Sequence, residues 1–418
     1  MTTNAEELAE TYRDLHAHPE LSFQETRTSG IVAGRLRALG YETTTGVGRT
    51  GVVGVLRNGA GPTALLRADM DALPVRERTG LPYASTVRAE DGQGREVPVM
   101  HACGHDVHVT CLLGAAEALA ADRSSWRGTL LLVFQPAEEV GGGAQAMVDD
   151  GLYERFGHPA VVLGQHVAPL PAGFLALRLG PAFAAADSLR IVLHGRGGHG
   201  SRPETSVDPV VMAAALVMRL QGIASREVAA AETAVVTIGS LRAGDKANII
   251  PDEAELLLSV RTFDKAVRTR VLDAIERVTR AEAAASGAPR PPEITTIESF
   301  PPVVNDREGC EVTRRGFDAD LGPGLVYDPG PVTGSEDVGL LAEAAGVPCV
   351  YWLLGGADPA EFAEATSVER VAEIVRALPS NHSPLFAPVI EPTLATGVAA
   401  LVSAARTWLP AEPRTTPA

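Results

Sequence analysis

The sequence predicts an α/β protein in which a small α+β domain is inserted into a larger one. With 418 residues, the chain is too long for one ordinary hydrophobic core. Continuous apolar runs such as 128–134 alternate with helical segments, as expected for strands that are buried on both faces of a sheet. Near residue 185 the strand pattern becomes alternating and half-polar. We therefore expect one domain formed by 1–184 and 299–418, and an inserted second domain at 185–298.

The N-terminal region predicts two helices followed by two strands. The helices are expected over 5–16 and 24–39, the second with a glycine stop signal at Gly40. Short apolar runs over 51–56 and 63–67, bounded by glycine and proline, are typical of strands.

The stretch Met100–His108 concentrates side chains that are scarce elsewhere. It holds one thiol, three imidazoles and one carboxylate, whereas the whole chain has ten histidines and four cysteines. Cys103 and His105 are one glycine apart, so both can face one point if the backbone turns sharply between them. Thiolate and imidazole suit zinc and other first-row metals. The alternative is the start of a helix, running to about Ala121, that happens to carry histidines.

Further candidate ligands stand at the ends of three predicted strands: Asp69 and Asp71, Glu138 and Glu139, and His166. Open α/β sheets place their sites at the carboxyl ends of strands. Each residue alone has an ordinary structural explanation, such as a core histidine or a solvated turn. At an irregular strand end, however, one carboxylate can bind metal while its neighbour reaches a bound water. Metal-assisted hydrolysis requires that pair of roles.

The inserted domain predicts a small antiparallel sheet with two helices. Its expected elements alternate in the order strand, helix, strand, strand, helix, strand: 187–193, 208–220, 233–241, 254–261, 264–286 and 292–297. The first domain then resumes and ends with a strand at 349–353 and a helix at 394–409.

The segment 195–200 has the G-x-G-x-x-G spacing of a dinucleotide-binding loop. The next helix is expected only near 206–209, and no acidic residue at a strand end completes the motif. A nicotinamide-dependent oxidoreductase is therefore kept only as an alternative.

Composition narrows the class of protein. Lys plus Arg is 36 and Asp plus Glu is 52, a formal charge of −16, which argues against nucleic acid as a partner. The longest uncharged stretch, 159–177, is interrupted by prolines and glycine, so no membrane span is predicted. The four cysteines form no CxxC pair and no secretory signal is visible, so we expect a reducing cytoplasm.

Several blocks together resemble the M20 family of metallopeptidases, in its branch of aminoacylases, hippurate hydrolases and auxin-conjugate hydrolases. The blocks follow the family order along nearly the whole chain: LRADMDALP at 66–74, MHACGHD at 100–106, FQPAEE at 134–139, GSED at 334–337 and NHSPLF at 381–386. The resemblance implies a zinc-peptidase-like α/β catalytic domain with an inserted ferredoxin-like lid, through which the chain forms a homodimer or a higher homo-oligomer.

The resemblance also implies a site for two divalent metal ions. Its ligands would be Cys103, His105, Glu139, His166 and His382. Zinc is the expected metal, with manganese or cobalt as alternatives. Glu138 would be the general base and acid, and Asp71 would orient a ligand. In the wider family a histidine stands where Asp69 stands here, which leaves open the ligand that bridges the metals.

In the lid, His199 resembles the family's histidine that stabilises the oxyanion, often across a dimer. Asn248 and Arg261 resemble groups that hold the free carboxylate of a substrate. The alternatives are a structural role for His199, a turn at Asn248 and a surface salt bridge at Arg261. Val140 departs from the glycine usual in this branch. The resemblance implies hydrolysis of N-acyl amino acids, and the alternatives are an M20-type dipeptidase or aminopeptidase and a metal-binding protein without catalysis.

Overall fold

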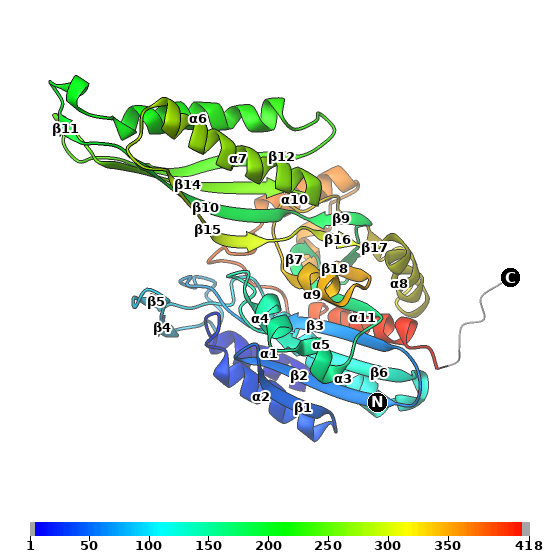
Figure 1. The fold of residues 1–418 in the computed structure, drawn as a ribbon. Helices are drawn as coiled ribbons and strands as arrows, with labels where there is room; N and C mark the ends of the chain where they lie inside the picture. Colours follow the sequence, from blue (N-terminus) through cyan, green and yellow to red (C-terminus); the bar gives the residue numbers. More distant parts are fainter. Residues whose placement is uncertain (1–4, 412–418) are drawn as a thin grey trace. The chain divides into compact units, whose positions relative to one another are not determined.

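The computed structural model describes residues 5–411, which form two compact units (Figure 1). Unit 1 comprises 5–180, 304–330 and 337–411, and unit 2 comprises Pro181–Val303 and Pro331–Glu336. The domain boundaries at 185 and 298 stay our proposal. Residues 1–4 and 412–418 of the predicted first domain lie outside the described residues.

Unit 1 is built on a mixed sheet. Within the described residues its strands are ordered β1 (Glu42–Val47), β2 (Gly51–Asn58), β6 (Gly128–Gln135), β3 (Thr63–Asp69), β7 (Val161–Pro171), β18 (Cys349–Ala357), β8 (Leu175–Ala176) and β17 (Val326–Tyr327). The central strands β6, β3, β7 and β18 are mutually parallel. Their carboxyl ends therefore meet at one edge of the sheet, where an α/β protein places its site.

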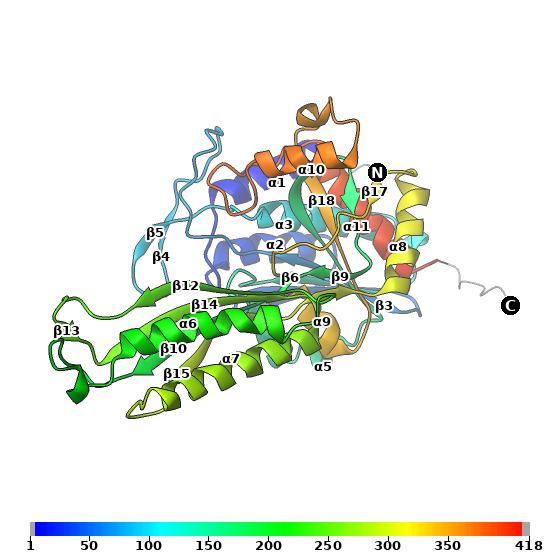
Figure 2. The same ribbon diagram turned by 90° about the horizontal axis from the view of Figure 1, so that it is seen from above.

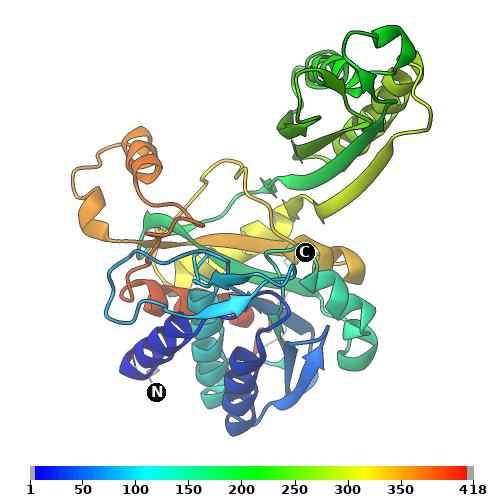
Figure 3. The same ribbon diagram turned by 90° about the vertical axis from the view of Figure 1, so that its left-hand side faces the viewer.

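Helices cover both faces of this sheet. One face carries α1 (Ala5–Ala17), α2 (Thr26–Ala38), α3 (His105–Ala121), α8 (Arg307–Asp320) and α11 (Thr393–Trp408). The blue and teal part of Figure 3 shows α1 and α2, which both pack against α3. The helices α4 (Gly143–Asp149), α5 (Leu152–Phe156) and α9 (Val338–Ala345) lie outside that core.

The apolar run at 128–134 is continuous because β6 is buried on both faces of the sheet. Its residues Leu130, Leu132 and Phe134 join the core with α1, α2, α3 and α11. The alternate residues Leu131 and Val133 are fully buried on the opposite face, and α4 contacts this strand. Full burial of each such side chain contributes about 1.5–3 kcal/mol to folding.

Unit 2 confirms the predicted order of strands and helices. Its main sheet, in the part of the chain described, is antiparallel with the order β12 (Ala234–Arg242), β14 (Glu253–Thr262), β10 (Ala185–His194) and β15 (Glu293–Phe300). Figure 2 shows α6 (Pro209–Arg226) and α7 (Lys265–Ala285) over these strands. The side chains of Asp208 and Asp264 cap these two helices by accepting backbone N–H groups.

Further short elements of the described chain are β4 (Arg88–Glu90), β5 (Glu96–Pro98), β9 (Gly180–Phe183), β11 (Gly198–His199), β13 (Ile249–Ile250), β16 (Val303–Asn305) and α10 (Val368–Ala377). In the same part of the chain, 3₁₀ helices lie at Arg123–Ser125, Pro203–Thr205 and Pro359–Phe362. β11 pairs with β13, and α6 begins only at Pro209, so no helix starts inside 195–200 to form a dinucleotide-binding loop. Between residues 5 and 411, every helix is too short or too polar to cross a membrane.

Candidate metal centre

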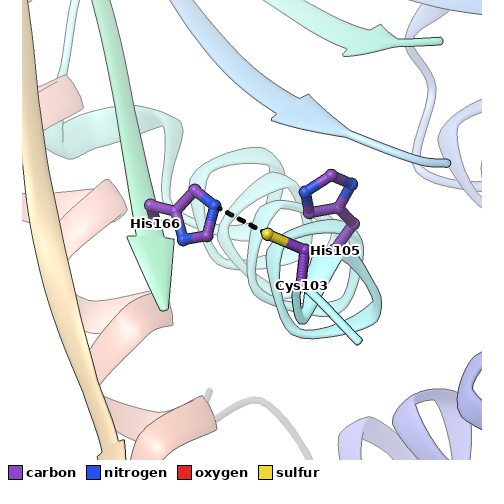
Figure 4. A group of neighbouring side chains, drawn as sticks. All are labelled: Cys103, His105 and His166. Carbon is purple, nitrogen blue, oxygen red and sulfur yellow. Dashed lines mark hydrogen bonds between the residues drawn. The ribbon is translucent and has the colours of Figure 1, made fainter. Parts of the chain in front are cut away.

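The predicted metal ligands converge in unit 1 at the edge where the parallel strands end. Their ligand atoms lie within 4.8 Å of one another in three overlapping groups: Cys103, His105 and His166; Cys103, Glu139 and His382; and His105, Glu138 and Glu139. Figure 4 shows the Cys103 sulfur pointing toward the His166 ring, with Sγ 3.5 Å from Nε2, and the His105 ring beside it. Cys103, His105 and Glu139 each belong to two of these groups.

A left-handed glycine makes the Cys-Gly-His turn. Gly104 has φ 83° and precedes the first residue of α3. A Cβ atom at this position would meet Val167 Cγ1 at 2.4 Å, so only glycine fits. The turn therefore places Cys103 and His105 on the same side, as the spacing indicates.

His382, the C-terminal candidate ligand, is held against this turn together with its neighbour Asn381. The His382 N–H donates to Ala102 O at 2.8 Å. Asn381 Nδ2 donates to the carbonyl oxygens of Cys103 at 3.0 Å and Val167 at 3.1 Å. Asn381 therefore ties three segments of the site together, a role that its place in the NHSPLF block did not reveal.

His166 lies within a strand, so its prediction at a strand end is wrong. β7 continues to Pro171 because β18 pairs with it in parallel through that residue. His166 Nδ1 donates to Val167 O at 2.8 Å. That bond places the proton on Nδ1 and leaves Nε2, the atom facing Cys103, with a lone pair for a metal.

His108 is engaged at both ring nitrogens. Val167 N–H donates to its Nε2 at 2.8 Å, and its Nδ1–H donates to Asp69 Oδ1 at 2.5 Å. Asp69 in turn accepts from the buried guanidinium of Arg67 at 2.7 Å. Burial would raise the pKa of Asp69, but Arg67 first, and then the histidines, hold that pKa well below its usual range. His108 therefore has no lone pair left for a metal.

Asp71 holds the turn that carries the paired glutamates. Its Oδ1 accepts the Glu138 N–H and its Oδ2 accepts the Glu139 N–H, each at 3.0 Å. Asp71 Oδ1 also lies 3.4 Å from His105 Nδ1. This fully buried carboxylate is thus placed to orient both a histidine and the glutamate turn.

The side chains present fit a divalent cation. Nε2 of His105 and Oε1 of Glu139 are buried without a hydrogen-bond partner among the described residues. His105 Nε2 and Glu139 Oε1 are 3.8 Å apart, and His382 Nε2 is 3.3 Å from Glu139 Oε2. Polar atoms buried in this way need a partner.

Charge supports the same conclusion. Burial, followed by the carboxylates of Glu139 and Glu138, raises the pKa of the Cys103 thiol well above its usual value. Burial would lower the pKa of His105, but the carboxylates of Asp69, Asp71 and Glu139 outweigh burial and raise it to about 10. The pocket therefore favours a positive charge among its sulfur, nitrogen and oxygen donors, the mixture that zinc and related metals accept.

The predicted lid residues lie in unit 2, at two places on its strands. His199, in β11, is exposed, and the neighbouring Gly200 N–H donates to Asn248 O at 2.9 Å. Arg261 is near the far end of β14 and forms no ion pair with the residues that the structure describes. The eight residue-to-residue steps from Glu253 to Arg261 in β14 span about 26 Å at about 3.3 Å each. His199 and Arg261 of the same chain therefore cannot both contact one small ligand.

Comparison with known proteins identifies relatives along most of the chain. Residues 65–381 match the model of peptidase family M20/M25/M40. A hippurate hydrolase of Campylobacter jejuni is 40% identical over 345 residues, which cover 81% of this chain and 85% of that protein. Thermostable carboxypeptidase 1 of Saccharolobus solfataricus is 38% identical over 349 residues, 82% of this chain and 84% of that protein.

A solved structure matches the whole fold. It is the YXEP protein of Bacillus subtilis, described as a dinuclear metal binding peptidase from the M20 family. It aligns with a TM-score of 0.76 and 30% identity over 97% of this chain and 98% of that one.

Proposed function

Because the chain belongs to peptidase family M20/M25/M40, in its amidohydrolase branch, we propose that it is a metal-dependent enzyme that hydrolyses the amide bond of N-acyl amino acids. The observation that carries this proposal is the convergence of five metal-binding side chains beside Glu138. Hippurate, the substrate named for one relative, is itself an N-acyl amino acid.

The residues proposed to hold two divalent metal ions are Cys103, His105, Glu139, His166 and His382. Zinc is the proposed metal, with manganese or cobalt as alternatives. Such ions, when bound, polarise an amide carbonyl and acidify the attacking water.

Glu138 is the proposed proton carrier. Its carboxylate is almost fully buried, and Oε2 lies 4.0 Å from His105 Nε2. In our proposal it takes a proton from the attacking water and returns that proton to the leaving amine, so the acyl group leaves as a carboxylate and the amino acid as a free amine. Asp71 orients His105 and keeps Glu138 beside it.

A panel of substrates tests this proposal. We expect the metal-loaded protein to release glycine from hippurate and amino acids from N-acetyl derivatives, with little release from dipeptides that have a free α-amino group. A chelator should abolish the activity, and zinc, manganese or cobalt should restore it. Cleavage of the free dipeptides alone would instead identify the protein as a dipeptidase or aminopeptidase.

The lid residues support a homodimeric site. Since His199 and Asn248 lie far along the sheet from Arg261, we propose that Arg261 from one copy and His199 with Asn248 from a second copy complete one site. Arg261 would bind the substrate carboxylate together with Asn248. Its buried Nη1 has no hydrogen-bond partner between residues 5 and 411, which is consistent with that role. His199 would stabilise the negative charge that develops on the carbonyl oxygen.

This proposal predicts that two variants with low activity restore activity when they are combined in one dimer. H199A and E138Q should each lower kcat by at least about 10²-fold, with metal content retained. Mixed dimers contain one site with both Glu138 and His199, so refolding the two variants together should restore about a quarter of wild-type activity. Recovery below a few per cent would contradict a shared site, and unchanged activity of H199A alone would leave the histidine structural.

A metal-binding protein without catalysis and a nicotinamide-dependent oxidoreductase have less support. A protein that only binds metal does not need Glu138 beside Glu139, and one hydrolysed substrate would exclude that function. A calorimetric titration with NAD should show no binding, because no helix begins inside the glycine-rich loop at 195–200.

The cysteines bear on where the protein works. All four lie within the described residues, are buried and form no disulfide bond. This supports our proposal of a reducing, cytoplasmic location, since an oxidising compartment favours disulfides.

A further inference from the structure

Glu25, at the start of α2, does not serve its own helix. It occupies the N-cap position, where a side chain normally accepts the first free N–H groups of the helix. Its side chain makes no such bond. Instead, Glu20 caps α2, because its carboxylate accepts the N–H groups of Arg27 at 2.9 Å and Thr28 at 2.8 Å.

The Glu25 carboxylate reaches the turn that precedes Glu138. Its Oε1 accepts the Ala137 N–H at 2.8 Å and the Phe23 N–H at 2.9 Å. Its Oε2 accepts the Thr50 hydroxyl at 2.5 Å. Glu25 is fully buried, so these bonds are shielded from water.

The turn at Ala137 determines where the glutamates point. Ala137 has φ 49°, a left-handed conformation that costs a non-glycine residue energy. Its carbonyl oxygen accepts the Gly143 N–H, and a Cβ atom at Gly143 would meet Pro136 O at 1.6 Å. The next two N–H groups, of Glu138 and Glu139, bind Asp71. Buried carboxylates thus hold three consecutive N–H groups, and Glu25 holds the first.

We propose that Glu25 is a positioning residue that fixes the backbone in front of the general base Glu138. This inference rests on the proposed amide hydrolysis, because it assigns Glu25 an effect on that reaction. Without the bond to Glu25, Ala137 relaxes from its left-handed conformation and Glu138 shifts relative to the metal ligands. A displacement of about 1 Å can cost about 10²-fold in rate.

Three variants test the proposal. E25A removes the bond to Ala137 and should lower kcat for hippurate by about 10–10²-fold, with KM within twofold and metal content unchanged. E25Q keeps an oxygen for the Ala137 N–H and should stay within about threefold of wild type. Burial and the charge of Asp71 raise the pKa of Glu25 to about 7, so the surroundings of this side chain accept a neutral group.

E20A is the matched control. It uncaps the same helix, so it should lower Tm by a few degrees and leave kcat within twofold of wild type.

Amide hydrogen exchange of the metal-loaded protein supplies a second measurement that does not depend on activity. E25A should speed the exchange of the Ala137 and Glu138 amides at least tenfold, whereas E20A should not. Wild-type kcat and wild-type exchange in E25A would overturn the proposal, as would equal losses of kcat in E25A and E20A. If E25A does not fold, a kcat for E25Q as low as that of E138Q would overturn it. If the wild type hydrolyses none of the substrates, the proposed function fails, while the exchange data still decide whether Glu25 holds the turn.

Discussion

Replacing Glu138 by glutamine is expected to lower kcat for an N-acyl amino acid by about 10²–10⁴-fold, the usual contribution of a general base. Glutamine has nearly the same volume and still leaves the backbone N–H bonded to Asp71. It cannot take a proton from water, so the loss comes from the chemical step. Metal content, measured by elemental analysis, should remain at the wild-type value because Glu138 is not a proposed ligand.

The adjacent glutamate provides the matched control. Glu139 Oε1 and Oε2 face His105 and His382 at 3.8 and 3.3 Å. E139Q should therefore lower metal content, and added metal should restore part of its activity. Added metal should not rescue E138Q. If E138Q keeps wild-type kcat, or if both variants lose metal equally, the separate roles of the two glutamates are wrong.

The sequence predicted the elements whose pattern is local and strongly apolar. The two N-terminal helices, the buried strands β2, β3 and β6, and the final helix are confirmed. β1 was missed because its residues, ETTTGV, form no apolar run and only Val47 among them is buried. α8 was missed because it is highly charged, and its few buried residues include only Cys310 and Phe317 as large apolar groups.

In the candidate site, too, the sequence predicted what is local and missed what depends on distant residues. The Cys-Gly-His spacing of 103–105 is a local signal, and the structure brings those two side chains near Glu139, His166 and His382. That they bind metal stays a prediction. The bond that Val167 N–H donates to His108 and the bond that Asn381 donates to Cys103 O join residues 59 and 278 positions apart, so no local pattern contains them. Only the folded sheet shows which side chains orient the candidate ligands.

Replacing Arg67 by methionine is expected to cost about 3–5 kcal/mol of folding free energy, because it strips the partner from buried charges. Arg67 is 2% exposed and donates to Asp69 at 2.7 Å, Gln135 at 2.9 Å and Asp337 at 3.1 Å. Both carboxylates are themselves buried, so water cannot replace the guanidinium. A urea titration measures the change.

A surface arginine on another strand of the same sheet serves as the control for this stability change. Arg57, in β2, pairs with Glu42 at 2.7 Å, but the two side chains are 57% and 73% exposed. R57M should therefore cost at most about 1 kcal/mol. The loss of folding free energy in R67K should lie between those of R67M and R57M. Lysine keeps the positive charge but lacks the forked guanidinium that reaches several acceptors. A cost for R67M no larger than that for R57M would contradict the buried network.

R67M should also weaken metal binding by about 10–100-fold, the usual effect of losing a group that orients a ligand. The path is a chain of contacts: Arg67 bonds Asp69, Asp69 accepts from His108, and His108 accepts the Val167 N–H. The carbonyl of the same residue, Val167, fixes the His166 tautomer. Competition with a chromophoric chelator, in buffer where R67M remains folded, measures the affinity. R67M could instead be destabilised and still bind metal as tightly as the wild type. That result would mean that the contacts of Arg67 stabilise the sheet but do not affect metal binding, and that Val167 orients His166 without them.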